Sequence, residues 1–142
     1  MDAKTLEQNG WSTVQMGGFT GQVGPFWTRE RDGQWEVGLL VEPRHANNHL
    51  GTIHGGVVMT FADIALGVAA ARALGSSNCV TTQLNTHFVA TAKVGDLVTC
   101  KPELVRQTPQ IYFVRGLIKS GEKTIAACDG IWKVIEPRPK AD

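Results

Sequence analysis

The chain has 142 residues, of which 42% are hydrophobic and 19% are charged, as in an ordinary globular protein. Fourteen lysines and arginines against thirteen acidic residues give a net charge of +1 without runs of like charge, which argues against a nucleic-acid partner. The one long apolar stretch, residues 57–74, is interrupted by polar and charged residues, and the N-terminus lacks the pattern of an export signal. We therefore expect a cytoplasmic protein with no membrane partner.

Three cysteines, Cys79, Cys100 and Cys128, are odd in number and widely spaced, which fits neither a disulfide framework nor a zinc site. Buried cysteine usually behaves as a small hydrophobic residue, so we expect reduced thiols in the core. A nucleophilic cysteine stays open, because the fold could place a base beside one of them.

The chain divides into a short N-terminal segment and one domain. Residues 2–8 favour a short helix that ends at Asn9-Gly10, within an adapter segment of residues 1–20. We expect a single domain over residues 21–137 and a short tail over residues 138–142.

The first half of the domain predicts a hairpin followed by a long helix. Residues 22–30 and 34–42 form two strands, joined where Asp32-Gly33 supplies the positive φ angles of a tight turn. Residues 56–74 predict a helix about 28 Å long, stopped at Gly75. Because this helix is apolar nearly all round, it should be buried on most sides.

The second half predicts an antiparallel meander of four strands, with short connections between neighbours. These strands cover residues 79–91, 96–107, 110–119 and 124–135. The fold class is therefore α+β, with one long helix wrapped by a curled antiparallel sheet of about five to six strands, the hotdog arrangement. Such a sheet keeps an open edge, which a second copy of the chain can cover.

Asp63 is the most informative residue for function, since it lies in the middle of the apolar helix. A carboxylate there costs several kcal/mol unless it is hydrogen-bonded, paired or part of a site. A hydrogen bond to a buried hydroxyl is the alternative to a functional role.

The tripeptide His54-Gly55-Gly56 stands at the start of the same helix. Free N–H groups at a helix start favour negative charge, and glycine lets a ligand approach the backbone, so a developing oxyanion would fit there. Asn48 adds an amide that can hold a water or a carbonyl, although Asn47 and Asn48 are also common turn residues.

No metal or cofactor is expected. His45, His49 and His54 lie on a loop without a Cys, Asp or Glu at a recurrent ligand spacing. The sequence also lacks the Gly-x-Ser-x-Gly turn of serine hydrolases and a phosphate-binding loop.

Gly55 and Asp63 are eight positions apart, which is about 12 Å along one helix. They cannot act on one carbonyl within a single chain. If they share a site, Asp63 comes from a second subunit whose helix lies antiparallel beside the first, as in a two-fold dimer. Function therefore predicts a homodimer.

The run Asn48-His49-Leu50-Gly51-Thr52-Ile53-His54-Gly55-Gly56, followed by Asp63, resembles the signature of the PaaI-like hotdog thioesterases. The likeness extends over residues 42–96, including Thr81-Thr82-Gln83-Leu84-Asn85. It does not include residues 1–20.

The resemblance implies hydrolysis of an acyl-CoA substrate by a homodimer, or by a tetramer made of two dimers. The Gly55 N–H would polarise the carbonyl, and Asp63 would activate water or attack directly; Asn48 and His54 complete the motif. Thr81 stands where the family often has a hydroxyl beside the carboxylate, and an ordinary strand threonine is the alternative. The acyl group and the residues that bind the CoA phosphates stay open, with Arg72, Lys93 and Arg106 as candidates by charge alone.

Two other functions remain open. A hotdog dehydratase or hydratase shares the architecture but places a histidine and an acid in other motifs, and a non-catalytic acyl-CoA-binding module would not need Asp63.

Overall fold

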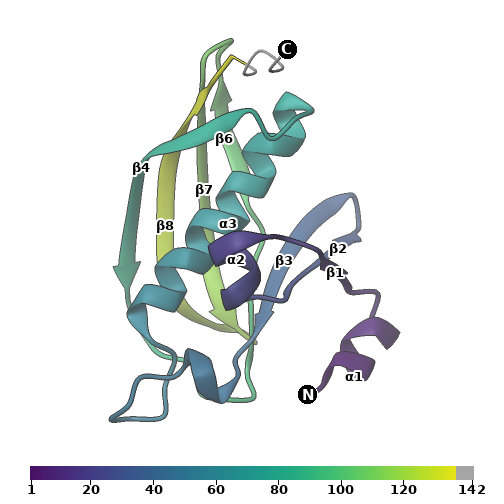
Figure 1. Cartoon of the computed structure of the whole chain (residues 1–142), viewed down its shortest axis with the longest axis vertical. Helices are drawn as coiled ribbons and strands as arrows, with labels where there is room; N and C mark the ends of the chain where they lie inside the picture. The colour runs from purple at the N-terminus through teal and green to yellow at the C-terminus, as the bar shows by residue number, and fades with distance from the viewer. Residues whose placement is uncertain (137–142) are drawn as a thin grey trace.

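The structure is a computed structural model that describes residues 1–136. In chain order the elements are α1 Ala3–Gln8, β1 Ser12–Val14, α2 Gly18–Val23, β2 Phe26–Arg31, β3 Gln34–Leu40, the 3-10 turn η1 Pro43–His45, α3 Gly55–Leu74, β4 Cys79–Phe88, β5 Leu97–Cys100, β6 Glu103–Gln107, β7 Ile111–Ser120 and β8 Lys123–Val134. One curled antiparallel sheet wraps the long helix α3 (Figure 1). The predicted α+β hotdog fold is confirmed, but the sheet has eight strands rather than five to six.

The order of the strands corrects the predicted meander. The sheet runs β1-β2-β3-β5-β7-β8-β4, and β6 pairs with β7. β4 pairs with β8 and not with β5, because both edges of β5 are already paired, one with β3 and the other with β7. The chain therefore crosses from one side of the sheet to the other between β4 and β5. As a result, β4 forms an edge of the sheet beside α3 (Figure 1).

The strands differ from the prediction in three further ways. β1 pairs with β2 and adds a strand to the sheet. The first predicted strand starts later, since residues 18–23 form α2 and Pro25, which has no N–H, precedes β2. The strand predicted over residues 96–107 is divided into β5 and β6 at Pro102.

Other local predictions hold. α1 is capped by Asp2, whose side chain accepts a hydrogen bond from the Thr5 N–H. Asp32 and Gly33 have φ angles of 53° and 73°, as the turn between β2 and β3 requires. The limits of the domain stay a prediction, and the tail over residues 138–142 lies outside the described residues.

Small residues bring α3 close to the sheet on the side of β8. A Cβ at Gly67 would lie 3.2 Å from the indole nitrogen of Trp132, and one at Gly130 would lie 2.6 Å from the same ring system. Trp132 is buried and pairs in register with Thr81 of β4. This packing sets the distance between α3 and β4, on which the candidate site depends.

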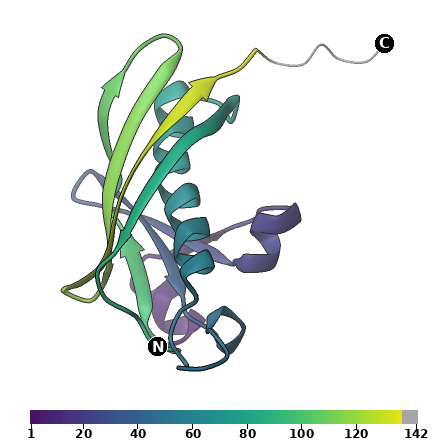
Figure 2. The same cartoon turned by 90° about the vertical axis from the view of Figure 1, so that its left-hand side faces the viewer.

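α3 is only partly covered within one chain. The sheet lies on one side of the helix and α2 on the other (Figure 2). By length and composition α3 would also suit a membrane span, with a mean hydropathy of 1.7, yet Phe61, Ala65 and Leu66 pack into the core. Only 33% of this apolar window is buried. The prediction of a helix buried on most sides is therefore wrong for the single chain, because part of α3 beside β4 has no covering element.

Candidate active site

Asp63 meets a hydroxyl from the edge strand. The Thr81 hydroxyl donates a hydrogen bond of 2.6 Å to Asp63 Oδ1. Asp63 is half-buried on α3, and Thr81 is exposed on β4. This bond satisfies one carboxylate oxygen, and within residues 1–136 it leaves Oδ2 free for a water or a substrate. The hydrogen bond and the helical position together hold the carboxylate in one orientation.

The first turn of α3 leaves one N–H available. The Gly56 N–H donates to His54 Nδ1 over 2.8 Å, and the N–H groups of Val57 and Val58 donate to the His54 carbonyl. Among residues 1–136, the Gly55 N–H has no acceptor. An exposed N–H at the positive end of a 20-residue helix is suited to bind a developing oxyanion.

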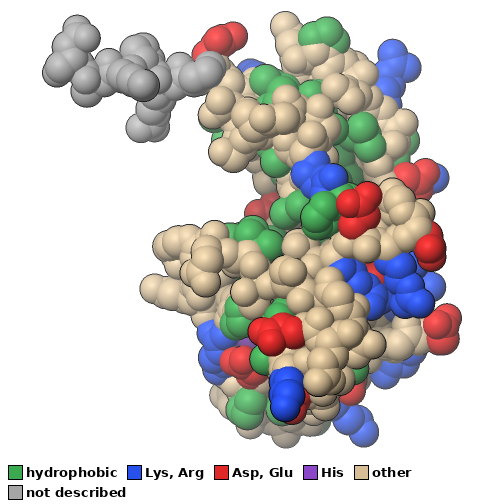
Figure 3. Space-filling view, turned by 90° about the vertical axis from the view of Figure 1, so that its right-hand side faces the viewer, with side chains coloured by type: hydrophobic (Ala, Val, Ile, Leu, Met, Phe, Trp, Pro, Cys, Tyr) green, Lys and Arg blue, Asp and Glu red, His purple; other side chains and the backbone are tan. Residues whose placement is uncertain are grey.

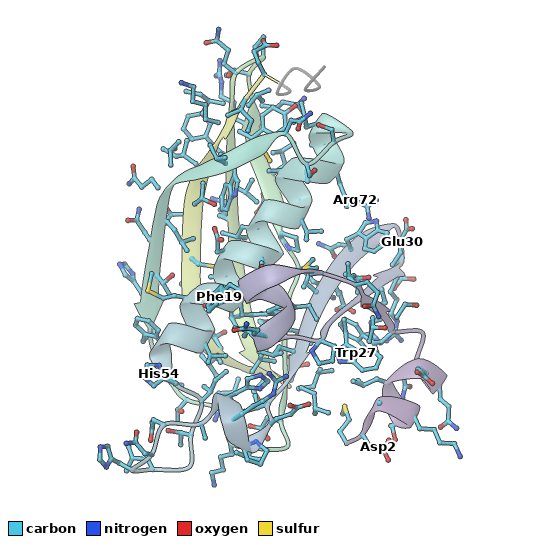
Figure 4. The ribbon with its side chains drawn as sticks, in the orientation of Figure 1. Asp2, Phe19, Trp27, Glu30, His54 and Arg72 are labelled. Atoms are coloured by element: carbon cyan, nitrogen blue, oxygen red, sulfur yellow. The ribbon has the colours of Figure 1, made fainter. Side chains whose placement is uncertain are left out.

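His54 acts as the N-cap of α3 in this arrangement. Because Nδ1 accepts the Gly56 N–H, the proton of the neutral ring lies on Nε2. The His54 ring accepts the N–H of Gly56, so the neighbouring N–H of Gly55 is the donor left without an acceptor among residues 1–136. Figure 4 shows His54 at the start of α3, far from Arg72 near the other end of the helix.

The two adjacent asparagines of the loop have different surroundings. Asn47 Oδ1 accepts the N–H groups of His49 and Leu50, so Asn47 holds the turn. The Asn48 side chain is exposed and makes no hydrogen bond within the described part of the chain. Asn48 is thus the one of the pair that is available for a ligand.

A buried histidine anchors this loop. His45 Nδ1 accepts the Glu42 N–H over 3.0 Å, and its Nε2 lies 2.7 Å from the Val23 carbonyl at the end of α2. The His45 carbonyl accepts the His54 N–H. Of the three histidines considered as metal ligands, His45 therefore has both ring nitrogens in protein hydrogen bonds.

The structure brings Asp63 to Thr81 but does not bring Gly55 to Asp63. Both lie on the continuous helix α3, eight residues apart, so about 12 Å of helix separates them. Gly55 and Asp63 lie on the same broad side of α3, rotated from each other by about 80°, and Met59 stands midway between them.

Sequence reasoning missed Phe88, the last residue of β4. A Cβ placed at Gly55 would lie 3.5 Å and 3.7 Å from the Phe88 ring atoms Cε1 and Cζ. Phe88 is 53% exposed. No local pattern signals this residue, since its contact with Gly55 depends on where β4 lies in the sheet.

The candidate phosphate-binding residues lie in different places. The Arg72 guanidinium stacks on the Trp35 ring at 3.6 Å, near the hairpin of β2 and β3. The backbone of Lys93 forms an isolated antiparallel β-bridge with that of Thr52, so Lys93 lies beside the loop that carries Asn48. Arg106 is on β6. Figure 3 shows that basic and acidic side chains are intermixed on the side of the molecule it presents.

The cysteines are core residues rather than exposed nucleophiles. Cys100 and Cys128 are buried on either side of Gly116, whose carbonyl accepts a hydrogen bond from the Cys128 thiol. The interaction between the two thiols raises the pKa of Cys100 and lowers that of Cys128. Burial also raises the pKa of the Cys79 thiol. A raised pKa reduces the fraction of reactive thiolate at neutral pH.

The comparisons with known proteins identify the family. The family model "Thioesterase superfamily" matches residues 50–127. A Pseudomonas aeruginosa protein that is provisionally named an esterase is 32% identical over 112 residues, which cover 78% of this chain and 83% of that protein. The chain therefore belongs to the thioesterase superfamily, and its class is that of the thioester hydrolases.

Solved structures agree with this assignment. A Bacillus halodurans protein, whose structure was determined with CoA, is 31% identical with a TM-score of 0.71, over 82% of this chain and 76% of that one. A Ralstonia eutropha protein related to phenylacetic acid degradation, provisionally named a thioesterase, has a TM-score of 0.73 over 85% of this chain and 92% of its own, at 23% identity. The likeness to this protein shows the shared fold, and the family model with the Pseudomonas aeruginosa relative confirms the thioesterase resemblance predicted from the sequence.

Proposed function

We propose that this protein hydrolyses acyl-CoA thioesters to a free acid and CoA, in the cytoplasm, at sites shared by two subunits. The observation that carries the proposal is the pair of groups left free on one face of α3: the Gly55 N–H and the Oδ2 of Asp63, whose Oδ1 is held by Thr81. Membership of the thioesterase superfamily and the CoA-bound relative from Bacillus halodurans support acyl-CoA as the substrate. The three free thiols suit a reducing compartment.

The chemistry needs few groups. The Gly55 N–H would stabilise the negative charge that develops on the thioester oxygen, and Asp63 would deprotonate a water or attack the carbonyl carbon itself. Asn48, exposed on the loop before α3, would orient the water or the carbonyl. The thiolate of CoA leaves without a strong acid.

The second subunit follows from the 12 Å between Gly55 and Asp63. With two α3 helices antiparallel across a two-fold axis, Gly55 of one chain faces Asp63 of the other, and Met59 lies at the axis. Met59 is 38% exposed, and the β4 edge carries the exposed apolar residues Val80 and Phe88. A partner strand on this edge would pair its free backbone groups and cover the open side of α3. We propose this homodimer as the active unit, with two dimers forming a tetramer.

The proposal is tested by measuring free thiol release from a panel of acyl-CoA thioesters with purified protein. We expect turnover of at least one thioester. Loss of the enoyl chromophore from enoyl-CoA without thiol release would instead indicate a hydratase, and calorimetric binding without turnover would indicate a binding module. Either result would replace the hydrolase assignment.

Thr81→Val should lower kcat roughly tenfold, because it removes the hydroxyl that orients Asp63 while it keeps the shape of the side chain. Thr81→Ser retains the hydroxyl and should restore most of the activity. Thr82→Val is the matched control, since the Thr82 hydroxyl bonds the Ile131 carbonyl and not Asp63. Equal kcat values for Thr81→Val and the wild type would make Thr81 an ordinary strand residue.

Asn48→Ala should lower kcat roughly tenfold to a hundredfold, since it deletes an orienting group and not the reactive one. The thermal midpoint should stay close to that of the wild type, because the Asn48 side chain makes no hydrogen bond within residues 1–136. Asn47→Ala should show the opposite pattern, with a lowered thermal midpoint, because Asn47 holds the turn. Wild-type kinetics for Asn48→Ala would leave Asn48 as a turn residue only.

A further inference from the structure

We propose that Phe88 determines which acyl groups the enzyme accepts, an inference that rests on the proposed thioester hydrolysis. The starting observation is the contact between this ring and the glycine that carries the free N–H. Two ring atoms of Phe88 lie 3.5 Å and 3.7 Å from the position of a Cβ on Gly55. Within the described residues, and leaving aside the two chain neighbours His54 and Gly56 and the backbone of the same helical turn, no other group comes within 4 Å of that position.

This contact places the ring beside the reacting carbonyl. A carbonyl oxygen that accepts the Gly55 N–H lies about 2.9 Å from the nitrogen, and the carbonyl carbon is about 1.2 Å further. The first atoms of the acyl group must then occupy the space next to Gly55, where Phe88 forms one wall. A change in the size of this side chain therefore acts on the acyl group close to the point of reaction.

The chemistry of the surroundings indicates which end of the substrate meets the ring. Met59, which is 38% exposed, is one helical turn from Gly55 on α3. Phe88 from β4 and Met59 from α3 thus make the surface near the Gly55 N–H apolar. The acyl group of a thioester gains free energy against such a surface, whereas the polar amides of the pantetheine arm would lose hydrogen bonds with water.

The position of Phe88 in the sheet also fits this role. In the pairing of β4 with β8, Phe88 lies opposite Ala126, whose side chain is buried in the core, so both point to the α3 side of the sheet. The ring nevertheless remains half exposed at the end of the edge strand. In the dimer proposed above, the partner strand would lie along this edge, so the Phe88 side chain would lie at the subunit interface, where the shared site would also lie.

The test compares kcat/KM for short, long-chain and aryl acyl-CoA thioesters among the wild type, Phe88→Ala, Phe88→Leu and Phe88→Trp. The ratio of bulky to small acyl groups should rise about tenfold or more in Phe88→Ala and fall by a similar factor in Phe88→Trp, because small changes of pocket volume have effects of this size. Phe88→Leu, which keeps an apolar residue on the edge strand, should lie between the wild type and Phe88→Ala. Val105→Ala is the matched control, since Val105 is an exposed apolar residue on β6, a strand that pairs with β7 and not with β4.

The oligomer size and thermal midpoint of each variant are measured alongside, so that loss of assembly is recognised as a uniform loss of activity on all substrates. Folded variants that keep the selectivity of the wild type would overturn the assignment of Phe88 alone. A wild type that hydrolyses no thioester of the panel would overturn the proposed function, and the assignment of Phe88 with it.

Discussion

Asp63→Asn should lower kcat by on the order of a hundredfold or more, because the amide can neither take a proton from water nor attack a carbonyl. The substitution keeps the volume of the side chain and an oxygen that can accept the Thr81 hydroxyl. We therefore expect the fold and the oligomer to be unchanged, with the loss confined to catalysis. Steady-state kinetics by thiol release, together with size-exclusion chromatography, measure both quantities.

Asp129→Asn is the matched control for this variant. Asp129 is an exposed carboxylate on β8 that accepts a hydrogen bond from Asn85, so the same chemical change is made away from α3. Its kcat should equal that of the wild type. If Asp63→Asn retained the kcat of the wild type, Asp63 would have no part in the reaction and the mechanism would fail.

The long helix and the hairpins could be predicted because their signals are local. Asp32-Gly33 determines the first turn, and a run of helix-forming residues that ends at Gly75 determines α3. The pairing of β4 with β8 could not be predicted in this way. Short connections favour pairing between strands that follow each other in sequence, which would place β4 beside β5. In the structure β3 lies beside β5, and this position of β3 depends on the arrangement of the whole sheet.

The candidate site shows the same division. The spacing of Asn48, Gly55 and Asp63 is a property of one continuous segment, and it was sufficient to predict that Gly55 and Asp63 are separated within the chain. The selection of the Gly55 N–H by His54 required the atomic geometry of the helix start. The contact of Phe88 with Gly55 joins residues that are far apart in sequence, so it appeared only in the structure.

The shared site predicts that two inactive proteins can complement each other. Asp63→Asn removes the carboxylate and keeps the Gly55 N–H, whereas Gly55→Val keeps the carboxylate and fills the oxyanion position with a branched side chain beside Phe88. Each homodimer should be nearly inactive, because every site contains one defect. Gly55→Ala is the control for folding, since a Cβ at that position meets the Phe88 ring at an ordinary van der Waals distance.

The measurement is the thiol-release activity of an equimolar mixture of the two variants after subunit exchange, with exchange confirmed by mass or by a tag on one chain. In a mixed dimer, one site receives both defects and the other receives neither. With random exchange half of the dimers are mixed, so activity should recover to about a quarter of the wild-type value. If each site were built within one chain, every site in the mixture would still contain one of the two defects. Confirmed exchange without recovery of activity would therefore contradict the shared active site.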